Sequence, residues 1–502
     1  MAFVQNFPFF TIIMTLFCGP ISTVLSGKKA KIVNLGLITL VGLMNLAVFM
    51  FCFTHNTSYT YMMGHFPAPW GNEIRVGVLE SFMAVFFCII MFLCVISGTK
   101  ERDKEIEGTK HNLYYVMVNL LLSSLIALIY TNDIFTAYVF VEINTISACG
   151  LIMIRQIGRT IEAATRYMIM SLLGSGCLLL GIIFLYDLTG HLLMSNIQQA
   201  VAVLAQNGQY HIPLLVSICL MSVGLGIKSG LFPFHSWMPD AYGYSTLSSS
   251  SILSSLVSKG YIFLLIKIFY RVIGFDVICD SKVINILFIF GIIGMIMGSI
   301  DAISEDSVRR MIAYSSVAQI GYIYMGLGLG TTAGVVASIY HILSHAATKS
   351  LLFVAASGLT DVSNGKYKFK NLTGAAYRNK MAGVAFTVGA LSMVGFPLLS
   401  GFISKVLFAT AAIENHYKMY ITLIALAIST ILNTVYFLKT VIRIYTPISK
   451  EEETEKNYTH LTFKDAPLKS VALVIFIIIN LTLGLASGHI VELIEAGLSM
   501  FM

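Results

Sequence analysis

Apolar segments of membrane-spanning length recur along this chain and restrict what it can fold into. A helix needs roughly 20 mostly apolar residues to cross the hydrocarbon core of a bilayer. Fourteen such segments occur, and only short polar connections separate them. They cover residues 8–26, 32–53, 76–97, 112–130, 133–154, 163–187, 212–232, 246–271, 283–302, 309–329, 332–357, 382–413, 419–445 and 469–488. The sequence therefore predicts an all-α polytopic membrane protein with about 14 transmembrane helices.

Composition supports this class and excludes others. The chain is 57% hydrophobic and only 11% charged, whereas soluble domains carry roughly 25% charged residues. None of the eight cysteines forms a CxxC pair, which argues against an iron–sulfur or zinc site. No P-loop, nucleophile–base pair or nucleic-acid surface is recognisable. We expect no cofactor, no metal, no nucleic-acid partner and no catalytic redox site in this chain.

Positive charge alternates between the connections. The connections after odd-numbered segments hold Lys28, Lys29, Lys31, Lys100, Arg102, Lys104, Lys110, Arg155, Arg159, Arg309, Arg310, Lys366, Lys368, Lys370, Arg378, Lys380, Lys450, Lys456 and Lys464. Those after even-numbered segments hold few, namely Arg75, Lys282 and Lys418. Because basic connections stay in the cytoplasm, both termini are predicted outside. No basic residue precedes Lys28, so the first segment is expected to be a retained span rather than a signal peptide.

A lysine beside a proline break marks the seventh segment. Lys228 ends an apolar run, and Pro233 follows five residues later. Proline interrupts a helix and leaves backbone carbonyls unpaired, which a membrane tolerates only against protein or water. An ionisable residue at such a break is a functional candidate, because transporters place ion sites there. The alternative is a lysine that snorkels to the interface.

A similar pattern returns five segments later. Residues 392–405 again combine glycine, Pro397 and a lysine, Lys405, and the twelfth segment is predicted to break near Pro397. The two patterns are five spans apart. Because successive spans alternate in direction, an odd separation would place the second copy in the opposite orientation in the membrane. Inverted repeats with two broken helices are typical of transporters, although two unrelated Gly-Pro kinks would produce the same pattern.

Further ionisable residues lie inside predicted spans. Glu142 is in the middle of the fifth segment, where a carboxylate protonates or finds a cation, and Arg166 in the next segment is a candidate partner. A static ion pair is the alternative. Lys259 lies mid-span behind a serine-rich run that could hold water. Lys267 and Arg271 lie nearer the outer end and are interpreted as snorkelling side chains.

Two histidines and a lysine share one face of the eleventh segment. His341, His345 and Lys349 are spaced i, i+4 and i+8, within roughly an 80° arc of a helix. The HxxxH spacing could bind zinc, but the glutamate of HExxH and a third ligand are missing. Histidines that titrate near neutral pH suit a proton relay better. At equal depth, a polar axis along the bilayer would run through Glu142, Lys228, Lys259, these three residues and Lys405.

Five ordered motifs carry a family resemblance. They are residues 133–142, 228–241, 309–316, 340–353 and 395–405, within roughly residues 75–445. The chain resembles the antiporter-like proton-translocating subunits shared by respiratory complex I, energy-converting membrane hydrogenases and Mrp-type Na+/H+ antiporters. Because the sequence ends soon after the last span, the long lateral helix of the largest family member is not expected. The D-type antiporter subunit and its M/N-type complex I relatives are the nearest types.

The resemblance implies an architecture and a set of site residues. It implies inverted five-helix repeats of spans 4–8 and 9–13, which divide the chain into residues 1–111, 112–272, 273–446 and 447–502. The family's functional residues match Glu142, Lys228, Lys259, His341, His345, Lys349 and Lys405 here. The family's basic pair follows an acidic residue two positions earlier, where this chain has Ser307, next to Asp306.

Two classes of function stay open. One is proton translocation within a multisubunit antiporter or a redox-driven pump, with protons as the transported ion and Na+ as a further candidate. The other is a structural membrane scaffold in the same complex. Partners implied are other membrane subunits and, in the redox complexes, hydrophilic iron–sulfur subunits.

Overall fold

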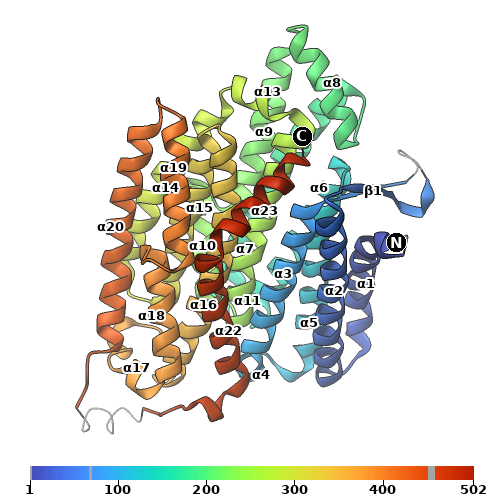
Figure 1. Cartoon of the computed structure of the whole chain (residues 1–502). Helices are drawn as coiled ribbons and strands as arrows, with labels where there is room; N and C mark the ends of the chain where they lie inside the picture. Colours follow the sequence, from blue (N-terminus) through green and yellow to red (C-terminus); the bar gives the residue numbers. More distant parts are fainter. Residues whose placement is uncertain (1–2, 67–70, 450–457, 502) are drawn as a thin grey trace.

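The computed structural model describes residues 3–66, 71–449 and 458–501, which form an almost entirely helical bundle (Figure 1). Its long helices are α1 (Phe7–Ile21), α2 (Gly27–His55), α3 (Val78–Ser97), α5 (His111–Tyr130), α6 (Ile134–Met153), α7 (Gly158–Thr189), α9 (His211–Ser229), α14 (Val283–Ser304), α15 (Val308–Gly328), α16 (Thr332–Asp361), α18 (Lys380–Val394), α19 (Ser400–Glu414), α20 (Met419–Ile444) and α22 (Pro467–Leu485). Shorter helices are α4 (Thr99–Glu105), α8 (Met194–Gln206), α10 (Met238–Tyr244), α11 (Leu247–Ile252), α12 (Ser258–Lys267), α13 (Phe275–Asp280), α17 (Ala375–Arg378) and α23 (Ser487–Ser499). The strands β1 (Tyr59–Met62) and β2 (Glu73–Val76) form an antiparallel hairpin.

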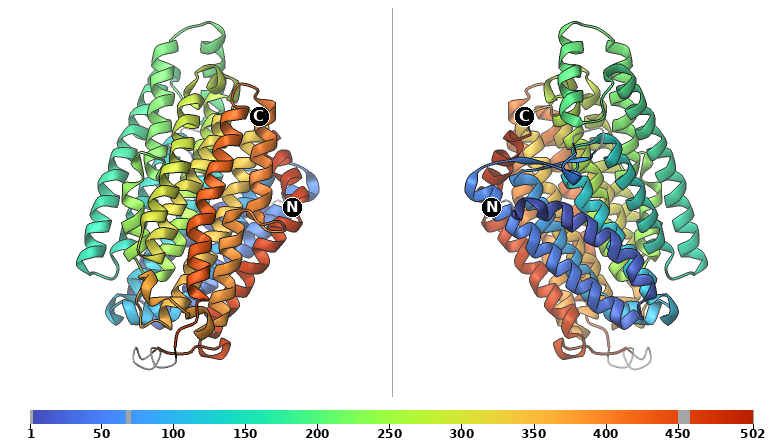
Figure 2. Two further views of the ribbon diagram at one scale, coloured as in Figure 1. Left: turned by 90° about the vertical axis from the view of Figure 1, so that its left-hand side faces the viewer. Right: turned by 90° about the vertical axis from the view of Figure 1, so that its right-hand side faces the viewer.

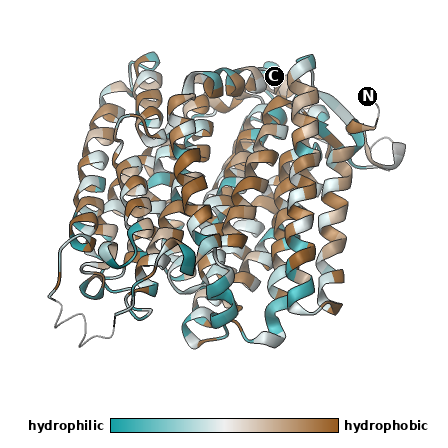
Figure 3. Cartoon of the chain, turned by 60° about the horizontal axis from the view of Figure 1, so that its bottom comes forward, coloured by the Kyte–Doolittle hydropathy of each residue, from teal (hydrophilic) through white to brown (hydrophobic). Residues whose placement is uncertain are grey.

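The predicted polytopic α-helical fold is confirmed. In the described part of the chain, twelve helical stretches are long and apolar enough to cross a membrane. The other two predicted segments are α15, which has 21 residues but a less apolar sequence, and the interrupted pair α18 and α19. Apolar residues cover the middle of the helices, and hydrophilic residues gather towards their ends and in the connections (Figure 3).

Burial separates the central helices from the peripheral ones. The stretch from Leu247 to Ile273 is buried over its whole apolar window, and α16 over 94% of its window. For α7 and α20 the share is 39%. The two side views place α1 and α2 at one edge of the bundle and α20 at the other (Figure 2). The elements that carry Lys259 and the histidine face therefore form the centre of the molecule.

The basic connections gather at one end of the bundle. The segments around α4 and α17 and the chain leading to α22 lie at the bottom of Figure 1, while α8 and α13 lie at the opposite end. Lys450 and Lys456, two of the residues used to predict the orientation, lie outside the described residues. The end that holds α4 and α17 is called the basic end below.

The elements outside the predicted spans include two amphipathic helices of 13 residues each. The connection predicted for residues 189–210 contains α8, and the chain beyond the last predicted span forms α23, which has 13 residues. Both helices bury only a few apolar side chains at helical spacing, such as Ile197 and Val201 of α8. Such short amphipathic helices are too weakly apolar to register as membrane spans.

Candidate functional site

The seventh predicted span is broken where Pro233 predicted it. Helix α9 ends at Ser229, Gly230 follows in the left-handed region with φ 78°, and a 3₁₀ helix η5 (Phe234–Trp237) leads into α10. The break leaves Lys228 in the last turn of α9, completely inside the bundle. A snorkelling lysine would reach an interface instead, so that alternative is wrong for Lys228.

Lys228 is held by a carboxylate and a hydroxyl of α6. Its Nζ lies 3.7 Å from Glu142 Oε1 and donates a hydrogen bond of 2.7 Å to Thr145 Oγ1. Glu142 also accepts a hydrogen bond from Ser175 of α7. The Lys228 side chain is fully buried, whereas that of Glu142 is 26% exposed. The ammonium therefore depends on this carboxylate for compensation of its charge.

Glycines bring α7 and α9 close enough to build this arrangement. A Cβ atom on Gly224 would lie 2.6 Å from the carbonyl oxygen of Gly174, and one on Gly174 would lie 3.0 Å from Lys228 Cγ. Any larger residue would push the two helices apart. The contact sets Lys228 beside the turn of α7 that carries Ser175.

A chain of polar side chains leads from this pair towards the centre of the bundle. The hydroxyl of Tyr261 in α12 lies 3.4 Å from Thr145 Oγ1 and donates a hydrogen bond of 2.9 Å to Asn144 Oδ1. The Lys228 Nζ lies 5.5 Å from the centre of the Tyr261 ring. Asn144 in turn donates to Ser124 Oγ of α5 at 2.9 Å. Buried polar groups linked in this way can rearrange their hydrogen bonds together.

Lys259 lies in α12, the helix that also carries Tyr261, next to a π-helical turn. The π-helix η6 (Leu253–Val257) connects α11 and α12, and Lys259 Nζ donates to the backbone oxygen of Ser254 within it. A second contact of 3.2 Å reaches Ser258 Oγ. A π-turn alters the regular hydrogen-bond ladder and is frequent at functional sites. Lys259 is completely buried, and no carboxylate of the described chain lies within ion-pair distance of it.

Hydroxyl groups join η6 to α16 at the centre of the bundle. Ser255 Oγ and Ser350 Oγ lie 2.7 Å apart. Lys349, next to Ser350, is fully buried; its Nζ donates to the backbone oxygen of Ile312 at 2.9 Å and to Ser315 Oγ. Lys259 and Lys349 are thus brought to one region, each held by backbone and hydroxyl oxygens.

The predicted histidine face exists and is stacked. The rings of His341 and His345 lie 5.8 Å apart with an interplanar angle of 13°, and Tyr322 stacks on His341 at 5.5 Å. His341 Nδ1 lies 2.5 Å from Ser404 Oγ of α19. Neither ring nitrogen of His345 has a hydrogen-bond partner among the described residues. Among these residues no third His, Cys, Asp or Glu joins the pair in a metal-binding group.

The second break holds Lys405. Helix α18 ends at Val394 and α19 begins at Ser400, around Pro397, as predicted. Lys405 Nζ donates 2.6 Å to the backbone oxygen of Val394 and 2.9 Å to Thr430 Oγ1. Gly395, at φ 93°, makes room for it, since a Cβ there would lie 3.0 Å from Lys405 Cδ. The ammonium therefore caps the carbonyl end of α18, where the helix dipole favours a cation.

The predicted pairing of Glu142 with Arg166 is wrong. Arg166 binds Glu162 Oε1 at 2.6 Å and Asp240 Oδ2 at 2.8 Å. Glu142 contacts Ser175 instead, which is nine residues further along α7 than Arg166. At 1.5 Å per residue that separation is about 13 Å, too long for the guanidinium to span. Arg166 therefore belongs to a charge cluster at the basic end.

The same cluster contains the basic pair of α15. Arg310 binds Glu305 Oε1 at 3.0 Å and also forms an ion pair with Asp240. Arg309 donates 2.5 Å to the backbone oxygen of Ser245. Within the pair, Arg310 is thus bound by Glu305 and Asp240, and neither Ser307 nor Asp306 supplies a carboxylate to it.

The interpretation of Lys267 and Arg271 as snorkelling side chains is also wrong. Both are buried, with exposures of 0% and 1%. Lys267 Nζ donates to the backbone oxygens of Leu128, Ile129 and Thr131 at the end of α5. Arg271 forms an ion pair of 2.5 Å with Glu80 of α3, itself fully buried. Backbone oxygens at the end of α5 and a carboxylate of α3 bind these two side chains, which were expected to reach the polar membrane interface instead.

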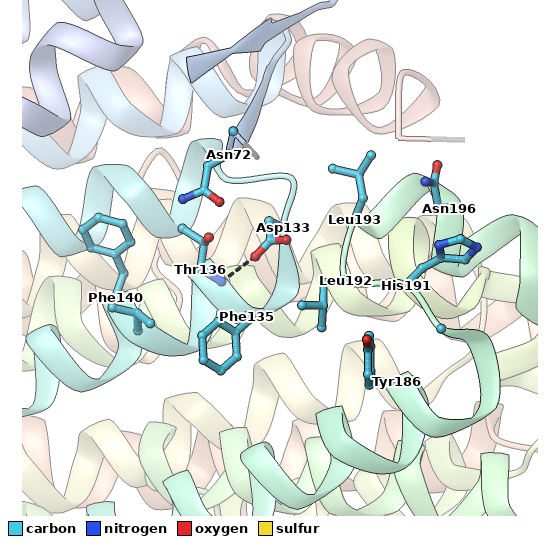
Figure 4. A pocket seen from close by; sticks show the side chains of 13 residues that line it. Asn72, Asp133, Phe135, Thr136, Phe140, Tyr186, His191, Leu192, Leu193 and Asn196 are labelled. Atoms are coloured by element: carbon cyan, nitrogen blue, oxygen red, sulfur yellow. Dashed lines mark hydrogen bonds between the residues drawn. The ribbon is translucent and has the colours of Figure 1, made fainter. Parts of the chain in front are cut away.

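A pocket of about 580 Å³ opens at the end opposite the basic connections. The start of α6, the end of α7 and the start of α8 line it, with Asp133 capping α6 through a 2.6 Å hydrogen bond from Thr136 N (Figure 4). None of its lining residues belongs to the predicted site. It lies beside the helix that carries Glu142 but does not contain the carboxylate.

The hydroxyl groups of the site were missed by sequence reasoning. Thr145, Ser175, Tyr261, Ser404 and Thr430 each contact a predicted ionisable residue or its direct partner. Hydroxyl residues are common in transmembrane helices, so composition gives no reason to select these. One usable signal was spacing, since Thr145 lies three residues after Glu142 and therefore on the same helix face.

The central part of the chain, including both broken helices, matches a known protein family. Residues 131–432 match the family described as "NADH:quinone oxidoreductase/Mrp antiporter, TM". The match covers more than half of the chain. The chain belongs to this family of antiporter-like membrane subunits.

Individual relatives agree with this assignment. NADH-quinone oxidoreductase subunit N of Desulforudis audaxviator is 31% identical over 393 residues, covering 77% of this chain and 75% of the relative. The D-type subunit of the Na(+)/H(+) antiporter of Alkalihalophilus pseudofirmus is 24% identical over 419 residues, covering 83% and 82%. A chain in the structure of the Mrp complex from Dietzia sp. DQ12-45-1b superposes with a TM-score of 0.86 at 20% identity, covering 99% of this chain and 97% of that one. The last comparison supports the fold.

Proposed function

We propose that this chain moves protons across the bilayer as an antiporter-like subunit of a larger membrane complex. The route uses Glu142, Lys228, Lys259, the histidine face with Lys349, and Lys405. The observation that carries the proposal is the buried Lys228 beside a broken helix, paired with Glu142 at 3.7 Å. Ionisable residues inside a membrane are expensive to bury and therefore mark ion paths.

Hydroxyl bridges between the charged groups support a connected route. Thr145 and Tyr261 lead from Lys228 into the helix of Lys259, and Ser255 with Ser350 leads from there to α16. Ser404 connects the histidine face with α19, which carries Lys405. A proton added at one group changes the Coulomb energy of the next, and at low dielectric this coupling is strong. Charge movement can therefore propagate along the row.

The two broken helices support an inverted repeat. Each broken helix carries a lysine close to its break, with Lys228 one residue before the end of α9 and Lys405 in the second turn of α19. The two breaks are five predicted spans apart, the odd separation that an inverted insertion requires. In this arrangement residues 112–272 and 273–446 are the two repeats, with residues 1–111 before them and 447–502 after them.

The cellular setting is proposed from charge and family. The basic end faces the cytoplasm and both termini face outside, in a bacterial or archaeal cytoplasmic membrane. Other membrane subunits are the partners, because relatives are named as subunits of Mrp antiporters and of NADH-quinone oxidoreductase. If the complex is of the redox-driven kind, iron–sulfur subunits join it.

The test is Lys228→Ala in the assembled complex, reconstituted in vesicles. Proton transport should be lost while the amount of assembled complex stays unchanged, because the variant removes the paired cation and leaves α9 in place. Transport at the unsubstituted level would refute the proposal. A scaffold function predicts instead that activity follows the amount of complex recovered.

A further inference from the structure

The pocket of about 580 Å³ at the end opposite the basic connections takes no part in the proposed route. Its volume falls within the range of small-molecule sites, roughly 300–1,000 Å³. Three of its lining residues, Phe135, Val139 and Tyr186, are large side chains exposed on the outside of the bundle. An occupant of the pocket therefore touches both the polar connections at this end and the bilayer beside α6 and α7.

Charged and apolar lining residues lie at different depths in this pocket. Asp133 and His191 lie in connections, just before α6 and just after α7, whereas Val139 lies six residues further along α6 than Asp133. At 1.5 Å per residue, Val139 is about 9 Å deeper along the helix axis. In Figure 4 Asp133 lies above the rings of Phe135 and Tyr186. This arrangement matches an amphiphile with its headgroup at the polar end and its chains beside α6.

The carboxylate of Asp133 determines which headgroup fits the polar end. Its Oδ1 accepts the capping hydrogen bond from Thr136 N, and its Oδ2 has no hydrogen-bond partner among the described residues. Among the described lining residues Asp133 is the only carboxylate, and none is a lysine or an arginine. The side-chain amides of Asn72 and Asn196 also line the pocket and can donate to phosphate oxygens. A headgroup with an ammonium and a phosphate therefore finds a partner for each group.

We propose that this pocket binds a phospholipid whose headgroup carries a primary ammonium group, with its acyl chains against α6 and the end of α7. The ammonium donates a charge-assisted hydrogen bond to Asp133 Oδ2, which the headgroup of phosphatidylglycerol cannot do. The aromatic side chains of Phe135 and Tyr186 contact the lipid near the membrane–water boundary, where tyrosine and tryptophan are enriched in membrane proteins. This binding does not depend on the proposed proton route.

The first experiment measures lipid binding to the assembled, detergent-solubilised complex by native mass spectrometry, with dioleoyl phosphatidylethanolamine and dioleoyl phosphatidylglycerol as probes. Asp133→Asn should weaken the binding of one phosphatidylethanolamine molecule about tenfold, the scale of a hydrogen bond to a charged group, and leave phosphatidylglycerol binding unchanged. Asparagine still caps α6, so the helix is kept. Asp187→Asn is the matched control, because Asp187 is exposed near the end of α7 and does not line the pocket; it should change neither lipid.

The second experiment fills the apolar part of the pocket. Val139 is exposed and lines the pocket, so Val139→Trp occupies the space of the acyl chains without disturbing the buried core. The complex should then retain one phosphatidylethanolamine molecule fewer than the unsubstituted complex after the same detergent wash. Leu180→Trp is the control, because Leu180 is an exposed apolar residue of α7 that does not line the pocket. The control should retain the full number of lipids.

Two results would overturn the proposal. One is equal phosphatidylethanolamine binding by the Asp133→Asn and Asp187→Asn complexes, and the other is an equal loss of both lipids in Asp133→Asn. A neighbouring subunit that fills the pocket with a basic side chain predicts the first result, together with unchanged lipid retention in Val139→Trp. If Asp133→Asn does not assemble, the comparison of Val139→Trp with Leu180→Trp decides. Lipid binding is measured without transport, so these outcomes are independent of the Lys228→Ala test.

Discussion

Lys228 in the first half of the molecule is stabilised differently from Lys349 and Lys405 in the second half, and from Lys259, which also lacks a carboxylate partner among the described residues. In the first half, Lys228 lies 3.7 Å from the carboxylate of Glu142. In the second half, Lys349 and Lys405 are held by the backbone oxygens of Ile312 and Val394 and by hydroxyls. Among the described residues neither of these two lysines forms an ion pair with a carboxylate.

This difference has a consequence for proton affinity. A full negative charge stabilises an ammonium far more than partial charges do at the same distance. The Lys228 site is thus suited to retain a proton, and Lys349 and Lys405 are suited to release one when another cation approaches. The contact of 2.7 Å between Ser255 and Ser350 brings the helix of Lys259 next to Lys349, so such a cation is available. Movement of charge should therefore be directional. It should run from Lys228, which is paired with Glu142, to Lys349 and Lys405, which have no carboxylate partner among the described residues.

Glu142→Gln tests the paired half and should have the largest effect. Glutamine keeps the shape but leaves the Lys228 ammonium without a counter-charge, a loss of about 3–5 kcal/mol, so transport should fall roughly a thousandfold. The measurement is proton transport per assembled complex. Normal assembly with normal transport would show that the ion pair is only a static link between helices.

Lys405 tests the unpaired half. Lys405→Ala should lower transport on the order of 100-fold, because the variant removes the group that releases the proton. Lys405→Glu should retain a measurable part, because a protonated carboxyl group can still donate to the Val394 oxygen and can also release its proton. Equal loss in both variants would argue that the positive charge itself, rather than proton release, is required.

Two matched threonine variants compare the halves directly and should have the smallest effects. Thr430→Val removes one of the two hydrogen bonds of Lys405 and should lower transport about tenfold, the scale of a hydrogen bond to a charged group. Thr145→Val removes the hydroxyl that binds Lys228 but leaves Glu142, so the loss should be about threefold or less. The opposite order would contradict the comparison of the two halves. Vesicle transport at equal complex content measures both.

Hydropathy was sufficient to predict most of the fold. Spans such as α2 and α14 are continuous apolar runs, and Pro233 and Pro397 located the two breaks because proline excludes a regular helix at fixed positions. Helix α8 was missed because only three of its residues are buried, so no apolar run stands out. The π-turn before Lys259 was also beyond reach, since the serines of that region fit a regular helix equally well.

The ionisable residues of the proposed site come from the sequence, but their partners could not be predicted from it. Charge inside an apolar run singles out Glu142 and Lys405 without any structure. Pairing depends on how far apart two side chains lie along neighbouring helices, and Arg166 was wrongly paired with Glu142 for this reason. Lys267 was misinterpreted because the carbonyls that bind it come from α5, 139 to 136 residues earlier in the chain.

The buried pair of Glu80 and Arg271 also constrains how the sequence of this protein can drift. Loss of either partner leaves an uncompensated charge in the bundle, about 3–5 kcal/mol, whereas replacement of both by apolar residues of similar volume is close to neutral. Selection should therefore remove a substitution at only one of the two positions. The ion pair and a pair of apolar residues are both tolerated, but changing one into the other requires both positions to change together. Lineages that carry the pair would keep both members together over long times, and lineages that lost it would show two apolar residues with no charged intermediate between them.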